Sequence, residues 1–423
     1  MKRIDRKDLR APARVIDLEL ASLSQIENSV AVQRYETIWC LSRINGIPQE
    51  VSFWDVTGDA SISIHDLRRH LCDGKATDDG GDFGSHHPNT LELDATVVVC
   101  TRNRPEGLRR TLTSLRCQTD SDFRILVVDN GSGSSSAVVE ELDLPRCDYV
   151  IEPVRGLSRA RNRALSMVCT DLVAWIDDDE VADVDWVRRI KEGFAHRTRP
   201  AAVCGVMLPA ELESEAQVRF EQYGGFNKGR GIFPEVLKMR APSVISPLYP
   251  LPAFGSGGNM AFRTTALRSV KGFDPFLGAG SRTRSGEDTR VLSLLLLSGH
   301  TVLHWPAAIT WHTHRREMIA LREQFYGYSA GLSAFYVSMI CSKPSVILDI
   351  LRLTPYVLRD LGRSSTSLRL GQLPEDFPRY LTKASRRGLI EGGFMYVYEA
   401  IKGSTTGRHS GRSSKAYCKL RQL

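Results

Sequence analysis

Residues 172–180 read LVAWIDDDE, an apolar run of strand length that ends in three consecutive aspartates. A buried strand tolerates such a cluster only where the charges are solvated, paired or bound to a cation. In an open α/β sheet the ligand site lies outside the carboxyl ends of the strands, where Asp177, Asp178 and Asp179 would fall. Side chains alternate along an extended chain, so we expect Asp177 and Asp179 on one side and Asp178 on the other.

Paired carboxylates of this kind are typical ligands of a divalent metal ion. Mg²⁺ and Mn²⁺ bind through one or two carboxylates and complete their coordination with water and substrate phosphate. Asp177 and Asp179 are therefore candidate ligands of Mn²⁺ or Mg²⁺. The alternative is a solvated acidic turn that leads into a helix near 182–195, and the flanking sequence has to decide between the two.

The segments around this stretch predict a parallel α/β sheet. Apolar runs of strand length alternate with segments of helical periodicity, which is typical of a three-layer α/β domain. The expected strands are residues 96–100, 124–129, 149–152, 172–176 and, further on, 201–208. The expected helices are residues 108–117 and 137–142 and a third helix capped by Ser158. The loops that follow the strands must then converge at one edge of the sheet.

These loops carry polar residues suited to a nucleotide diphosphate. Their candidate binding residues are Thr101, Arg102, Asn103, Asp129, Gly156 and Arg161. A helix N-terminus with arginine nearby favours an anion, and a metal ion on the fourth loop would bridge to it. The chain lacks GxxxxGK[ST], which excludes a P-loop, and GxGxxG does not follow the first strand, which argues against a dinucleotide fold.

A glycine-rich segment, GSGGNMAFR at 255–263, precedes another expected strand. Gly257 and Gly258 would let the backbone approach a ligand closely before Asn259, so this loop is a candidate site for the acceptor or the sugar. A β-bulge is the alternative interpretation.

Two later motifs add titratable groups. Glu287 and Asp288 begin an expected helix, where acids often complement the helix dipole, but Asp288 is also a candidate general base. His312 and His314 have a spacing that places both rings on one face of an extended chain, where an imidazole could supply a third metal ligand.

Both ends of the chain lie outside this domain. The Asn45-Gly46 pair between two strand-like runs predicts a β-hairpin in a small N-terminal α/β module. Residues 324–342 carry no charge, yet their apolar residues have helical spacing, which favours packing on the core over contact with a membrane interface. The expected organisation is a module at 1–72, a linker at 73–94, the main domain at 95–317, a helical extension at 318–401 and a basic flexible tail at 402–423.

The charge balance constrains the partners. The formal net charge is +7 and the basic residues are spread along the chain, which fits an anionic small ligand or a membrane surface at least as well as nucleic acid. We expect no nucleic-acid partner. The N-terminal residues do not resemble a secretory signal, so we expect a cytoplasmic protein. The basic tail could in addition attract the chain to the inner face of the cytoplasmic membrane.

Residues 95–317 resemble the inverting family 2 glycosyltransferases with a GT-A fold. The resemblance rests on seven motifs that occur in a specific order: VVVCTRNRP, ILVVDNGS, GLSRARNRAL, WIDDDE, GSGGNMAFR, GEDTRV and WHTH. It implies a three-layer α/β sandwich with a mixed, mainly parallel sheet. The N-terminal module and the helical C-terminal extension fall outside the family core.

The resemblance also implies roles for residues. Asp129 would read the nucleobase, Asp177 would contact ribose and metal, Asp179 would hold the ion, and Asp288, beside Glu287, would deprotonate an acceptor hydroxyl. The remaining implied contacts to the nucleotide sugar are Thr101, Arg102, Asn103, Gly156, Arg161 and Asp178. In similar bacterial galactofuranosyl- and rhamnosyltransferases a histidine after the base joins the metal, which fits His312 better than His314.

The implied activity is transfer of a sugar from a nucleotide-diphosphate sugar to a hydroxyl of a saccharide or lipid-linked saccharide, in bacterial cell-envelope, glycolipid or glycosylated-metabolite synthesis. Two alternatives stay open. A nucleotidyltransferase would need a glycine-rich basic loop after the first strand. The loop at that place, VCTRNRPEG, contains only one glycine, at its end, which argues against this alternative. A catalytically inactive subunit that binds nucleotide sugar would keep the same motifs.

Overall fold

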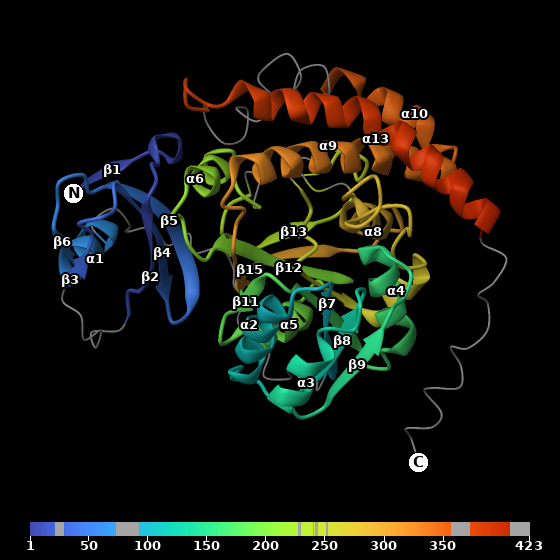
Figure 1. Ribbon diagram of the computed structural model, residues 1–423, viewed down its shortest axis with the longest axis horizontal. Helices are drawn as coiled ribbons and strands as arrows, with labels where there is room; N and C mark the ends of the chain where they lie inside the picture. Colours follow the sequence, from blue (N-terminus) through green and yellow to red (C-terminus); the bar gives the residue numbers. More distant parts are fainter. Residues whose placement is uncertain are drawn as a thin grey trace.

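A nine-stranded sheet carries the stretch 172–180 near its centre in the computed structural model (Figure 1). The described residues are 1–21, 29–72, 93–226, 230–239, 241, 244–250, 253–356 and 373–406. Across the sheet the strands are β11 (Glu180–Ala182), β15 (Val302–His312), β12 (Ala202–Pro209), β14 (Asn259–Arg263), β10 (Leu172–Asp177), β7 (Ala95–Thr101), β8 (Arg124–Asp129) and β9 (Cys147–Ile151), and β13 (Glu235–Leu237) pairs with β15.

The predicted parallel unit is confirmed, because β10, β7, β8 and β9 pair in parallel. Strand β14 runs antiparallel between β10 and β12, and β11 and β13 run antiparallel to β15, so the sheet is mixed but mainly parallel. In this register Asp177 lies beside Cys100, and Thr101 lies beside Asp129. The carboxyl ends of three strands are therefore level with one another, and the loops after them share one edge.

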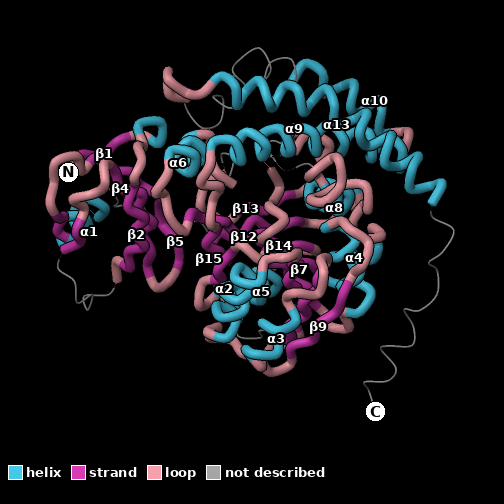
Figure 2. Tube along the Cα trace, viewed as in Figure 1, coloured by secondary structure: helices cyan, strands magenta, loops and turns pink. Residues whose placement is uncertain are grey.

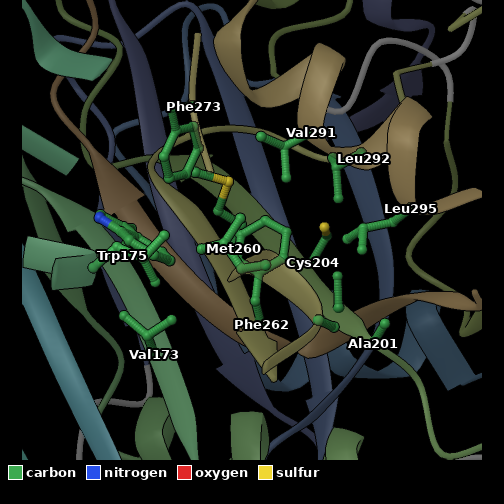
Figure 3. Packing of buried hydrophobic residues seen from close by; sticks show 14 of the residues in the cluster. Val173, Trp175, Ala201, Cys204, Met260, Phe262, Phe273, Val291, Leu292 and Leu295 are labelled. Carbon is green, nitrogen blue, oxygen red and sulfur yellow. The ribbon is translucent and has the colours of Figure 1, made fainter. Parts of the chain in front are cut away.

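Helices cover both faces of the sheet, as the alternation of apolar residues requires. Val97 and Val99 face α2 (Pro105–Arg116), α3 (Ser136–Leu142) and α5 (Trp186–Ala195), whereas Val98 faces α4 (Leu157–Met167), α7 (Thr264–Ser269) and α8 (Glu287–Leu297). Figure 3 shows the second layer, in which Trp175 meets Phe273 edge to face with ring centroids 5.3 Å apart.

Two local predictions need correction. Ser158 is not the cap of α4: the N-cap is Gly156 with a φ of 142°, and the Ser158 hydroxyl donates to the Leu277 carbonyl. The stretch 209–252, whose many glycine, proline and aromatic residues predict irregular structure, contains α6 (Glu215–Gln222), which begins with a capping box between Ser214 and Gln217. The S-x-x-Q spacing carries the signal for this helix.

The N-terminal residues form a sheet in the order β1 (Lys2–Ile4), β5 (Ile47–Asp55), β4 (Thr37–Ile44) and β2 (Ala13–Glu19). Beside it lie η1 (Arg6–Asp8), the pair β3 (Ser29–Ala31) and β6 (Ser61–Ser63), and α1 (Ile64–Cys72). The predicted hairpin is confirmed, with positive φ at Asn45 and Gly46. Trp39 and Leu41 share a hydrophobic cluster with Leu208 and Val218, so this module packs directly on the main domain. Of the predicted linker 73–94, only residues 93 and 94 are described.

Three described helices follow the sheet, and they are α9 (Met318–Ser342), α10 (Val346–Arg352) and α13 (Arg379–Thr406). Helix α9 lies between α13 and the main domain (Figures 1 and 2). The predicted packing of α9 on the core is confirmed by buried Phe335 and Met339. None of the helices in the described residues combines the length and hydropathy needed to cross a bilayer. The tail beyond residue 406 lies outside the described residues.

Glycines let α13 approach the backbone of α9. A Cβ atom on Gly392 would lie 2.0 Å from the Ala330 carbonyl oxygen, and one on Gly388 would lie 2.3 Å from the Tyr326 carbonyl oxygen. At Gly393, by contrast, an added Cβ would meet only the ends of the Val337 and Ser333 side chains, at 3.2 and 3.3 Å.

We predict that Gly392→Ala lowers the free energy of unfolding by about 1–3 kcal/mol, because the added methyl group collides with backbone that cannot turn aside. Gly393→Ala is the matched control on the same helix, and its effect should stay within about 1 kcal/mol. Chemical denaturation of both variants measures the difference. Equal effects would show that the helices do not depend on this contact.

Candidate active site

The acids after β10 form a tight turn. Asp177 ends the strand, Asp178 and Asp179 make the turn, and Glu180 begins β11. Carboxylate oxygens of Asp177, Asp179 and Glu180 all lie within 4.8 Å of one another. Asp178 points away and accepts a hydrogen bond from the Thr101 hydroxyl at 2.8 Å. Asp177 and Asp179 thus share a side, as alternation predicts, and the turn brings Glu180 to them.

The buried carboxylate of Glu180 is suited to a cation site. Neither carboxylate oxygen has a hydrogen-bond partner among the described residues, and the nearby Thr310 hydroxyl does not reach hydrogen-bonding geometry. Burial, together with the charge of Asp177, raises the pKa of Glu180 well above its usual range. A Cβ on Gly258 would lie 1.8 Å from Glu180 Oε1, so glycine alone fits there. An unpartnered buried carboxylate beside two others is suited to a metal ion.

His312 lies beside one member of this set of donor atoms, Asp179. It pairs with Glu180 across β15 and β11, and its Nε2 lies 3.6 Å from Asp179 Oδ1. Burial lowers the pKa of His312 to about 3, so the ring is neutral and keeps a lone pair for a metal. Three carboxylates and one imidazole fit Mn²⁺ or Mg²⁺, and the nitrogen donor favours Mn²⁺. His314 turns its Nε2 to Glu221 instead, at 3.1 Å.

Arg161 joins the acidic turn to the start of α8. This side chain is fully buried: one Nη donates to Glu287 Oε1 at 2.9 Å, and the other lies 3.4 Å from Asp177 Oδ1 and donates to the Gly257 carbonyl. Desolvation nevertheless raises the pKa of Asp177 to about 6 and that of Glu287 to about 7. Both Nη atoms are engaged with protein oxygens, so direct contact of Arg161 with a diphosphate stays a prediction.

Asp288 lies on the same side of the sheet as the acidic turn. Its Oδ2 is 3.4 Å from the position of a Cβ on Gly257, and its charge contributes to the raised pKa of Asp177. Unlike Glu287, it is only half-buried, and its Oδ1 accepts the Thr289 amide at 2.6 Å. The start of α8 rests on α9, because a Cβ on Gly286 would lie 2.6 Å from the Gly331 carbonyl oxygen.

The candidate nucleotide residues lie in loops that are tied to one another. Asp129 is completely buried and accepts hydrogen bonds from the Gly131 amide and the Tyr149 hydroxyl, both at 2.7 Å. Asn103 Oδ1 accepts the Ser132 amide. In these contacts Asp129 and Asn103 order the second loop, and their contact with a nucleotide stays a prediction.

Asn130, which sequence reasoning missed, connects three loops. Its side-chain oxygen accepts the Gly156 amide at 2.7 Å, its amide donates to the Glu152 and Val154 carbonyls, and its own carbonyl accepts the Arg102 guanidinium. In the sequence, an asparagine that follows the last aspartate of a strand is typical of an ordinary turn. The pattern therefore did not indicate that Asn130 connects three loops.

Asn259 corrects the prediction for the glycine-rich loop. Its side chain points into the core, where it accepts the Trp186 indole N–H and donates to the Val206 and Ala308 carbonyls, each at 2.9 Å. No polar atom of this side chain is left for a sugar. The Gly257 carbonyl accepts a hydrogen bond from Arg161, and the absence of a side chain at Gly258 leaves room for Glu180.

Residues 96–270 match the family model described as Glycosyl transferase family 2. This central segment of the chain is a glycosyltransferase family 2 domain. It is 30% identical over 245 residues to a pre-mycofactocin glycosyltransferase of Mycobacterium tuberculosis, an alignment that covers 56% of this chain and 47% of the relative. The chain thus spans about half the length of that relative. The family assignment decides against a nucleotidyltransferase.

Two further similarities cover more of the chain. A glucosyl-dolichyl phosphate glucuronosyltransferase of Haloferax volcanii is 28% identical over 324 residues, which is 72% of this chain and 96% of the relative. The solved structure of mannosyltransferase PcManGT from Pyrobaculum calidifontis, in complex with GDP-Man and Mn²⁺, is 15% identical with a TM-score of 0.43, covering 84% of this chain and 86% of that one.

In this family 2 domain two arginines contact the acidic turn in a way that the sequence did not predict. Arg104 Nη1 contacts Asp178 Oδ1 and Asp179 Oδ2 at 3.1 and 3.0 Å, and Arg315 lies 3.8 Å from Asp179 Oδ2. Despite burial, the positive surroundings of Asp179 hold its pKa below the usual range. Asp178 and Asp179 lie 74 and 75 positions from Arg104 in the sequence, so no local sequence pattern indicated these contacts.

We predict that Mn²⁺ affinity falls on acidification through about pH 6. The pKa of Asp177 is raised to about 6 in the metal-free protein, so protons compete with the cation for its carboxylate below that pH. Calorimetric titration with Mn²⁺ at about pH 5 and pH 7.5 measures the effect, expected to be roughly tenfold per pH unit below the pKa. Asp179→Ala, which removes a ligand, should not bind at either pH. Equal affinity of the natural chain at both pH values would contradict the assignment.

Proposed function

We propose that the chain is a metal-dependent inverting glycosyltransferase that transfers a sugar from a nucleotide-diphosphate sugar to an acceptor hydroxyl. The observation that carries the proposal is the convergence of separate segments on one site. Asp177, Asp179, Glu180 and His312 offer a set of metal ligands, and Asp288 lies beside them with an accessible carboxylate.

A divalent ion held by Asp177, Asp179, Glu180 and His312 would supply positive charge to the departing nucleoside diphosphate. Asp288 accepts the proton of the acceptor hydroxyl as that oxygen attacks C1 of the donor sugar. The bond between C1 and the diphosphate oxygen breaks on the opposite face, so one displacement inverts the anomeric centre. The proton stays on Asp288 until it passes to solvent.

Charged side chains that are held by other residues surround the proposed reaction site. Arg161 neutralises Glu287 from within the core, so Asp288 is the acid of the pair that remains available to a hydroxyl. Arg104 and Arg315 add positive charge at Asp179, where a diphosphate bound to the ion would lie. These arginines would favour an anionic leaving group over a neutral one.

We predict that Asp288→Asn lowers kcat by at least ~10²-fold while nucleotide-sugar affinity stays nearly unchanged, because general base help is worth ~10²–10⁴-fold. The assay is release of nucleoside diphosphate from UDP-, GDP- and dTDP-sugars with Mn²⁺, with NMR of the product anomer. Glu192→Gln serves as the folding control, because Glu192 lies on α5 and is distant from Asp288 in the sequence.

Near-normal turnover of Asp288→Asn would remove this residue from the mechanism. A product with the donor's anomeric configuration would exclude inversion. A natural chain that binds nucleotide sugar but never turns it over would favour the inactive subunit.

We further propose that the acceptor is a saccharide of the cell envelope carried by a lipid, and that α13 holds the enzyme at a membrane. The exposed apolar stripe of α13 consists of Ile390, Phe394, Val397 and Ile401, with exposures of 69, 77, 44 and 63%. Their spacing places all four on one line of the helix. Apolar surface of this kind is typical of a docking face.

The charge along α13 supports an anionic lipid surface as the partner. Arg379, Lys383 and Arg386 extend the same line toward the start of the helix, and all three are exposed. Residues 407–423 add five lysines and arginines and no acid. Basic residues beside an apolar stripe match a membrane surface with anionic headgroups.

We predict that Ile390→Ser with Phe394→Ser weakens binding to phosphatidylcholine vesicles containing phosphatidylglycerol by at least tenfold, since burying each side chain is worth about 1.5–3 kcal/mol. Vesicle flotation of the full chain measures it. Val184→Ser, at another exposed apolar position, should leave binding unchanged. Vesicle binding that survives the double substitution, or that is equal for uncharged vesicles, would contradict this docking face.

A further inference from the structure

A buried chain of hydrogen bonds runs from the candidate metal ligand His312 to the N-terminal module. The Nδ1 atoms of His312 and His314 lie 2.9 Å apart, and His314 Nε2 lies 3.1 Å from Glu221 Oε1. The Trp39 indole N–H donates to the other oxygen, Glu221 Oε2, at 3.1 Å. All four side chains are at most 5% exposed. Trp39 belongs to β4, Glu221 to α6 and His312 to β15, so the chain crosses two domains.

The donors and acceptors of this chain fix where the protons are. An indole N–H can only donate, and a carboxylate can only accept, so Glu221 accepts one hydrogen bond from Trp39 Nε1 and another from His314 Nε2. When His314 carries its hydrogen on Nε2, its Nδ1 accepts from Nδ1–H of His312 across the 2.9 Å contact. His312 Nε2 is then left with its lone pair, and this is the atom 3.6 Å from Asp179.

We infer that Glu221 and Trp39 are positioning residues that set the tautomer and orientation of His312 as a metal ligand. The N-terminal module therefore forms part of the active-site assembly, because it supplies the donor that holds Glu221. A partner that orients a ligating histidine typically changes metal affinity by 10–100-fold. The inference rests on the proposed metal site and deepens it.

Aromatic side chains pack against both imidazole rings. Phe226 meets His312 edge to face at 4.7 Å and Phe220 meets His314 at 4.9 Å, which shields the imidazoles from water. A Cβ on Gly225 would lie 2.3 Å from Glu221 Oε1, so the chain turns tightly around that carboxylate. These contacts restrict the hydrogen bonds of His314 to Glu221 and His312.

The module also holds α6 in place by other contacts. Gln222 Nε2 donates to the Leu9 carbonyl at 2.8 Å and to the Lys7 carbonyl at 3.1 Å. The Ala13 amide donates to the Leu212 carbonyl at 2.8 Å. The helix that carries Glu221 is therefore fixed between β15 and the module, and its carboxylate cannot shift without moving both.

Two substitutions in the full chain test the inference. Glu221→Gln keeps the shape but removes the obligatory acceptor, and Trp39→Phe keeps a ring but removes the donor. Trp54→Phe is the matched control, because Trp54 is a buried tryptophan of the same module whose N–H donates to the Ser52 hydroxyl instead. Titration with Mn²⁺ and with Mg²⁺, and the ¹⁴N modulation of bound Mn²⁺ in pulsed EPR, are the readouts.

We expect Glu221→Gln to weaken Mn²⁺ binding by roughly 10–100-fold and to reduce the ¹⁴N signal. Mg²⁺ binding should change less, because Mg²⁺ depends on oxygen ligands. Trp39→Phe should lower Mn²⁺ affinity by a smaller factor, and Trp54→Phe should not. A general structural defect would weaken both metals alike, so the ratio of the two affinities separates the explanations.

Unchanged Mn²⁺ affinity and ¹⁴N coupling in both Glu221→Gln and Trp39→Phe would overturn the inference while leaving the metal site intact. A natural chain that binds no Mn²⁺, or binds it without nitrogen coupling, would instead overturn the proposed metal site. ¹⁵N chemical shifts of the histidines in the natural chain provide a test that needs no substitution. Protons on Nδ1 of His312 and Nε2 of His314 are expected, and the opposite tautomers would refute the chain of donors.

Discussion

Repulsion among carboxylates at the end of β10 is the constraint on which the other features of the site depend. Two unit charges about 4 Å apart interact by about 4 kcal/mol at the effective dielectric near a protein surface, and here several acids converge. Arg161 offsets part of this charge from inside the core, and Arg104 and Arg315 offset part from outside. Burial of Glu180 without a partner leaves the balance negative. The divalent cation proposed for this site would offset the remaining negative charge.

The parallel core of the fold could be predicted because its signals are local. Strand and helix periods place β7, β8 and β10 within a residue or two of the structure, and the rule for strand ends places Asp177 and Asp179 together. Glu180 could not be placed in the same way, because alternation assumes an extended chain and the chain turns at Asp178. The motif that contains His312 and His314 was not assigned to a predicted strand, although β15 extends from Val302 to His312.

Contacts between distant segments account for the remaining differences. The side chain of Asn259 is held by α5, β12 and β15, and Trp39 meets Glu221 across 182 positions of sequence. Nothing in the local pattern of the N-terminal module indicates that its hairpin strand reaches toward the catalytic domain. Composition suggested a module separated by a linker, whereas the shared hydrophobic cluster around Trp39, Leu208 and Val218 makes the two parts one packed body.

The glycine contacts of α9 have a consequence for engineering. Gly331 of α9 abuts Gly286 at the start of the helix that carries Asp288, and Gly392 of α13 abuts Ala330 on the same α9. Backbone meets backbone at both places, so no side chain can rearrange to absorb a change. A main domain transplanted into another protein without these two helices would lose the support behind the start of the helix that carries Asp288. The smallest portable unit of this enzyme is therefore larger than the segment that defines its family.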